Sequence, residues 1–156
     1  MARQSLLWQP GLMRGRQTYD QPAGRSSRSD WWGVVLEAPD AQALARFYSE
    51  LLGWEIAKQS PDEEEAAIAP PDGVAYIGFQ KSAHYVRPVW PSAKGAQRIT
   101  MHLDFEVTDL PAAVAHALEL GAEEADHQPQ ANVRVMLDPA GHPFCLYVDE
   151  PSDPNE

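Results

Sequence analysis

Two side chains able to do chemistry, His102 and Asp104, stand either side of one apolar residue in the second half of the chain. Residues 100–107 alternate apolar and polar side chains, a period of two that predicts a strand with His102, Asp104 and Glu106 on one face. A histidine on such a face can act as a general base or as a metal ligand. The simpler interpretation is a pocket histidine that hydrogen-bonds to Asp104 or Gln80.

Cys145 is the single cysteine, and it is a candidate nucleophile if His102 lies near it. Its neighbours Phe144 and Leu146 are apolar, and a buried cysteine in such surroundings is usually unreactive. One cysteine excludes an internal disulfide and suits a reducing compartment, so we expect a cytoplasmic protein.

The predicted strand runs directly into a predicted helix. Asp109 can cap the first turn and Gly121 can end the helix. Apolar side chains recur at helical spacing between them, at Leu110, Ala113, Val114, Ala117 and Leu118. The polar face of the strand is therefore positioned by a strand–helix unit.

The same unit occurs earlier in the chain, so the sequence predicts two copies of one supersecondary module. The matching pairs are separated by 69 or 68 residues: Glu37 and Glu106, Asp40 and Asp109, Gly53 and Gly121, Gly73 and Gly141. The expected elements are strands at 32–38, 54–58, 66–69, 74–80, 101–107, 133–137 and 143–148, and helices that begin at 41 and 110.

The repeat also places Glu37 and Glu106 at equivalent strand ends. Two carboxylates that face one concave surface can work as an acid and base pair. Because charged side chains are rarely buried without a partner, exposure to solvent or pairing with Arg98 or Arg134 is the simpler interpretation.

Several motifs in this order resemble the glyoxalase/bleomycin-resistance/dioxygenase superfamily, also called vicinal oxygen chelate proteins, and its glyoxalase-like branch. They are Arg46-Phe-Tyr, Leu52-Gly-Trp, His102-Leu-Asp-Phe-Glu-Val and Asp138-Pro-Ala-Gly-His-Pro-Phe-Cys-Leu. The resemblance implies an α+β fold of two tandem βαβββ modules. These would form a curved mixed sheet with a concave pocket and with helices on the convex side.

The resemblance also implies where a metal would bind, at the positions of Gly33, Gln80, His102 and Cys145. None of these is a carboxylate, which hard divalent ions prefer, so we expect no metal cofactor. Zinc stays an alternative, because it accepts His102 and Cys145 and could take Asp104 as a third ligand. Strand geometry separates His102 and Asp104 by about 6.5–7 Å along the chain, which makes joint ligation awkward.

Aromatic residues suggest a pocket for a flat or apolar small molecule. Trp90 lies between prolines in the long connection between the modules, where we expect it to close one side of the pocket. The expected ligand-binding set is Gln80, His102, Asp104, Cys145, Trp90, Trp32 and Glu37.

Charge and composition divide the chain into a basic leader at 1–30, a glyoxalase-like domain at 31–150 and a polar tail at 151–156. Within the domain we expect module one at 31–81, a linker at 82–97 and module two at 98–150. The leader carries a net charge of +3 and the remainder −14. So acidic a body argues against nucleic acid, and no apolar run is long enough to span a membrane.

The sequence therefore predicts a metal-free small-molecule-binding protein that sequesters an aromatic or apolar metabolite or antibiotic. The alternative is a superfamily enzyme, a lyase, isomerase or dioxygenase, with His102 as its base or metal ligand. A homodimer is compatible with either interpretation.

Overall fold

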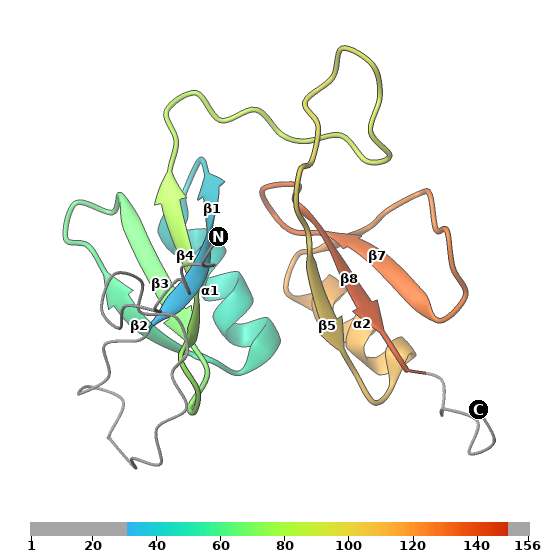
Figure 1. Cartoon of the computed structure of the whole chain (residues 1–156), viewed down its shortest axis with the longest axis horizontal. Coiled ribbons are helices and arrows are strands. Elements are labelled where there is room, and N and C mark those ends of the chain that lie inside the picture. The colour runs from blue at the N-terminus through green and yellow to red at the C-terminus, as the bar shows by residue number, and fades with distance from the viewer. Residues whose placement is uncertain (1–30, 150–156) are drawn as a thin grey trace, which may run out of the picture.

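The computed structural model describes residues 31–149, and the leader and tail expected from the sequence lie outside them. The described chain forms two βαβββ modules, which confirms the predicted α+β architecture (Figure 1). No helix in this range is long and apolar enough to cross a membrane.

The first module contains one helix and four strands. In chain order these are β1 Trp32–Ala38, α1 Ala41–Leu52, β2 Glu55–Gln59, β3 Glu65–Ala69 and β4 Ala75–Lys81. The sheet order is β1-β4-β3-β2, with β1 parallel to β4 and the other pairs antiparallel. The turn between β3 and β4 contains Gly73, whose φ of 80° is the left-handed conformation that a glycine adopts without strain.

The second module repeats this plan. Its elements are β5 Leu103–Glu106, α2 Leu110–Glu119, β6 Glu123–Glu124, β7 Val133–Leu137 and β8 Pro143–Tyr147, with sheet order β5-β8-β7-β6. The very short β6 was not expected, because two adjacent glutamates do not resemble a strand.

Both helices begin at the predicted caps. The Asp40 carboxylate accepts the Ala43 N–H at 2.8 Å, and the Asp109 carboxylate accepts the Ala112 N–H at 3.0 Å. The helices cover the sheet faces that carry the apolar side chains. His102, Asp104 and Glu106 point to the opposite, exposed faces, as the alternation predicted.

Aromatic packing joins the two modules. Tyr48 of α1 lies 5.7 Å from Phe79 of its own module, and 6.0 and 6.4 Å from Phe144 and Phe105 of the other, measured between ring centroids. The strands of the described residues form two separate four-stranded sheets, so these rings contribute to the interface instead of a β1–β5 ladder.

Strand β5 is shorter than predicted and begins at Leu103, which leaves His102 just before it. Leu103 pairs with Phe144, so Pro143 stands opposite His102. Because proline has no N–H to donate, the ladder ends there and the backbone of His102 is released from the sheet.

Candidate functional site

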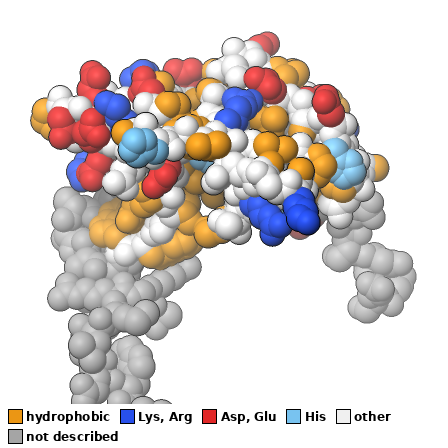
Figure 2. All heavy atoms as spheres, turned by 90° about the horizontal axis from the view of Figure 1, so that it is seen from above, with side chains coloured by type: hydrophobic (Ala, Val, Ile, Leu, Met, Phe, Trp, Pro, Cys, Tyr) orange, Lys and Arg blue, Asp and Glu red, His pale blue; other side chains and the backbone are white. Residues whose placement is uncertain are grey.

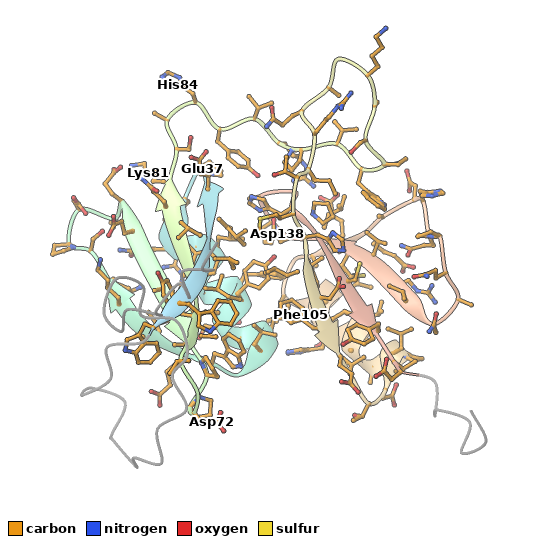
Figure 3. The ribbon with its side chains drawn as sticks, in the orientation of Figure 1. Glu37, Asp72, Lys81, His84, Phe105 and Asp138 are labelled. Carbon is orange, nitrogen blue, oxygen red and sulfur yellow. The ribbon has the colours of Figure 1, made fainter. Side chains whose placement is uncertain are left out.

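A cavity of about 520 Å³ lies between the two modules. Strand β1 forms one wall, the linker that follows β4 crosses over it, and the segment leading into β5 forms the other wall. Figure 3 shows Glu37 at the end of β1 beneath the linker, and Asp138 between the two sheets. Polar side chains that line the cavity are Glu37, Tyr48, His84, Tyr85, Gln97, Arg98, Thr100, His102 and His142.

A buried carboxylate organises the inner wall of this cavity. Asp138 is 1% exposed, and its Oδ1 accepts the backbone N–H groups of Ala140 and His142, both at 2.9 Å. Its Oδ2 accepts the Tyr48 hydroxyl at 2.9 Å and lies 2.8 Å from Nδ1 of His142. Each oxygen therefore has two partners, as a buried charge requires.

The hydrogen bonds define the proton positions on His142. Its Nδ1 lies against the Asp138 carboxylate, which has no proton to give, so Nδ1 carries the hydrogen. Its Nε2 lies 3.3 Å from the Tyr85 hydroxyl, which in turn donates to the Ala140 carbonyl at 2.7 Å. The Tyr85 hydroxyl hydrogen is therefore donated to the Ala140 carbonyl and not to His142. These three contacts link Asp138, His142, Tyr85 and the Ala140 carbonyl into one polar network.

The two tyrosines of this network stay protonated. Burial, and then the Asp138 charge, raise the pKa of Tyr48 well above its usual range. The same two causes raise the pKa of Tyr85 to about 12. Both hydroxyls therefore act as hydrogen-bond donors at neutral pH.

A second cluster, His102, Asp104 and Cys145, lies where β5 meets β8. His102 Nε2 is 3.2 Å from Asp104 Oδ1, and Cys145 is the register partner of Asp104. One ligand atom from each of the three lies within 4.8 Å of the others. The proposed hydrogen bond between His102 and Asp104 is thus compatible with the structure, and the side chains meet more closely than the strand spacing suggested.

Cys145 is a protonated thiol in this arrangement. Burial raises its pKa to about 11, and the charge and hydrogen bonding of Asp104 add to the effect. Phe144 and Leu146 point to the opposite face of β8, so the thiol is half-buried beside a carboxylate and not enclosed by apolar side chains. A thiol with so high a pKa is a poor nucleophile.

Comparison with known proteins identifies the family. The model of the glyoxalase-like domain matches residues 33–147, which is most of the chain. This chain belongs to the glyoxalase-like domain family. No functionally curated protein is similar enough in sequence to match it.

Solved structures of the glyoxalase/bleomycin-resistance/dioxygenase group share the fold. A family enzyme from Burkholderia phytofirmans PsJN is 20% identical with a TM-score of 0.55, and covers 74% of this chain and 95% of its own. A glyoxalase-related enzyme from Fulvimarina pelagi is 19% identical with a TM-score of 0.55, and the match covers 75% of this chain and 86% of that enzyme. The fosfomycin resistance protein FosX from Mesorhizobium loti is 13% identical with a TM-score of 0.54, and the match covers 76% of this chain and 91% of FosX.

This glyoxalase-like chain lacks side-chain ligands at the metal positions of its first module. Gly33 has no side chain, and a Cβ built there would lie 2.7 Å from the Tyr76 ring. Gln80 lines a different cavity from the one that His102 lines. Of the four positions implied by the family resemblance, Gln80 and His102 therefore line different cavities, and Gly33 offers no side-chain ligand.

The second module alone offers a different donor set. A nitrogen, a carboxylate oxygen and a sulfur from His102, Asp104 and Cys145 match the ligands that zinc accepts. Three protein ligands with an open fourth position are typical of a catalytic zinc. These three residues would hold the ion if zinc binds, with Cys145 as a thiolate.

A larger cavity of about 1010 Å³ lies over the open face of the first sheet. Small residues form most of its floor, at Ala67, Ala69 and Gly78, and Tyr76 lies beside them. Its charged side chains include Lys58 and Glu65, which pair with each other at 2.9 Å. This face offers room but few free groups for chemistry.

The structure separates the remaining predicted site residues. Glu37 lines the cavity between the modules and Gln80 the larger one. Trp90 lines neither, and its indole N–H donates to the His127 carbonyl at 3.3 Å. Trp32 is 53% exposed at the start of β1, also outside both cavities.

Sequence reasoning did not identify the Asp138 network or the part that His142 has in it. A signal was present, because Asp138 and His142 flank the Pro-Ala-Gly turn four residues apart. No local sequence pattern indicated that Tyr48 belongs to this network, because its partner Asp138 lies 90 residues away in the sequence.

Proposed function

We propose that this protein binds a small molecule in the cavity between its two modules, without needing a metal ion. The supporting observation is the cavity itself, which combines apolar walls with directed polar groups. Val34, Leu36, Ile99 and Pro143 contribute apolar surface, beside the hydroxyl, imidazole and guanidinium groups described above. Its volume falls within the range of about 300–1,000 Å³ that is common for ligand pockets.

Two features favour a function independent of metal. The first module contributes no side-chain ligand, because Gly33 has none and Gln80 lies in the other cavity. The high pKa of Cys145 also keeps the thiol neutral, so zinc would have to displace a proton as well as water.

The second candidate is an enzyme of the superfamily, either a lyase or isomerase that uses zinc, or a dioxygenase, which would need a redox-active metal in its place. The convergence of His102, Asp104 and Cys145 favours it. Zinc at this position would polarise a bound oxygen or activate water. His102 and Asp104 are 45% and 57% exposed in their side chains, so a substrate could reach the group.

A ligand screen on the metal-stripped full chain tests the first proposal. Thermal unfolding is measured with aromatic and apolar metabolites, and with antibiotics because one structural neighbour is a fosfomycin resistance protein. A ligand raises the unfolding temperature by mass action. We expect His102→Ala to weaken a hit found in this way, and His127→Ala, an exposed histidine outside the cavity, to leave it unchanged.

The same variants separate the two candidates. In a binding protein, His102→Ala reduces affinity and no product appears with either form. If product forms from a hit only when zinc is added, and His102→Ala abolishes it, the enzyme is the correct assignment. If no compound binds the cavity with or without zinc, both candidates fail.

A further inference from the structure

Four of the seven lysine and arginine side chains within residues 31–149 form ion pairs. Lys58, Lys81, Arg87 and Arg134 each form an ion pair with a glutamate. Viewed from the linker side, acidic side chains crowd one end of the molecule, and hydrophobic side chains reach the surface in the middle (Figure 2). Arg46, Lys94 and Arg98 form no such pair within this range, and of the three Arg98 alone lines either of the two cavities described above.

Arg98 lines the cavity between the modules. No ion pair or hydrogen bond within residues 31–149 includes its side chain. Glu37 is the single carboxylate among the described residues that line the cavity. An arginine offers a planar fork of N–H donors that matches a carboxylate or a phosphonate.

His142 and Tyr85 add a second set of polar groups to the same cavity. The buried carboxylate of Asp138 lies 2.8 Å from Nδ1 of His142 and orients the ring toward the cavity. Nε2 of His142 lies 3.3 Å from the Tyr85 hydroxyl oxygen, a long contact that a polar atom of a ligand can replace. Asp138 itself is enclosed and cannot meet a ligand.

We propose that the ligand of this cavity is a small organic acid, an anionic head group on an apolar body, with its head group held by Arg98. The inference rests on the proposed binding function and specifies its ligand class. The apolar body packs between β1 and the segment before β5, where Leu36, Ile99 and Met101 line the cavity. Glu37 lines the same cavity from β1 and, as a carboxylate, disfavours an anionic head group.

The test compares phenylacetate with its neutral isostere phenylacetamide on the full chain, by NMR titration of the backbone amides. We expect phenylacetate to bind more tightly, and Arg98→Gln to weaken it by about three- to tenfold, as for an exposed charge pair with good geometry. Glu37→Gln should tighten it by about two- to threefold, because a like charge is removed.

The matched control is Arg134→Gln, which removes a guanidinium paired with Glu124 outside the cavity. It should leave both affinities unchanged, and phenylacetamide should respond to none of the three variants. If both probes bind the cavity equally and neither Arg98→Gln nor Glu37→Gln affects phenylacetate, the anion proposal is wrong while the binding function stands. If neither probe perturbs the cavity amides, the anion proposal and the proposed binding site both fail.

Discussion

The hydroxyl of Tyr48 donates a 2.9 Å hydrogen bond to the carboxylate of Asp138, 90 residues further along the chain. Tyr48 belongs to the helix of the first module, and Asp138 to the turn before the last strand of the second. Within the described residues, no strand pair joins the two sheets. This buried bond, together with aromatic packing, therefore fixes how the modules meet, and with it the shape of the cavity between them.

Tyr48→Phe should lower the free energy of unfolding by about 1–3 kcal/mol, the cost of losing a hydrogen bond to a buried charged group. The ring stays in place, so packing against Phe79 and Phe144 is retained. Urea denaturation measures the effect. Tyr147→Phe is the matched control, because the Tyr147 side chain forms no hydrogen bond within residues 31–149, and it should change stability by less than about 0.5 kcal/mol.

Cys145 should make stability fall at alkaline pH. Its pKa is raised from 9.0 to about 11 in the folded protein, so the unfolded chain loses the thiol proton first as pH rises. The stabilisation is complete below the unfolded pKa, and it is lost as the pH rises from 9.0 to about 11. Urea unfolding is compared at about pH 8 and about pH 10. Tyrosines with a raised pKa also contribute to the loss of stability over this interval, so a variant without the thiol is needed for comparison.

Over that pH interval, the free energy of unfolding should fall by less in Cys145→Ala than in the native protein. The difference between the two proteins isolates the thiol, since both retain Tyr48 and Tyr85. Equal losses in the two proteins would show that the folded environment does not hold the thiol protonated.

Trp90→Ala should change the dissociation constant of a ligand in the cavity between the modules by no more than about twofold. A lost contact worth about 1.4 kcal/mol would change it about tenfold. The reason is its position, because the indole bonds to the His127 carbonyl and does not line the cavity. Titration of a ligand found in the screen provides the measurement. A large loss of affinity with an unchanged fold would contradict this prediction and show that Trp90 contacts the ligand, as the sequence suggested.

Zinc content distinguishes the two functional candidates without any substrate. Protein purified without added metal should contain less than one equivalent of zinc, and chelation should leave its thermal unfolding unchanged. Stoichiometric zinc that is lost in Asp104→Asn and in Cys145→Ser, but kept in the exposed control Asp126→Asn, would contradict this and favour the enzyme.

Local features of the fold could be predicted because single residues encode them. Asp40 and Asp109 cap the helices through bonds to amides three residues on. Gly53 ends the first helix with a φ of 66°, a left-handed conformation that glycine adopts without strain. The alternation around Asp104 predicted correctly that Asp104 and Glu106 face outward, but it placed Met101 on the core side, where the structure leaves it 68% exposed.

The site depends on contacts that no local pattern encodes. The partner of Tyr48 lies in the other module, and the strand that carries Asp104 is shortened by Pro143, far along the chain. His102 therefore meets Asp104 from a segment outside the ladder. The position of Trp90 similarly depends on the fold of a loop that the sequence could only place between prolines.

The most direct test of the central claim is an amide NMR titration of the metal-stripped full chain with a compound that raises its unfolding temperature. The account predicts perturbations at Gly33, Tyr85 and Thr100, which line the cavity between the modules, and the same dissociation constant after zinc is added. Perturbations confined to Ala67 and Gly78 in the larger cavity, or binding that appears only with zinc, would contradict it.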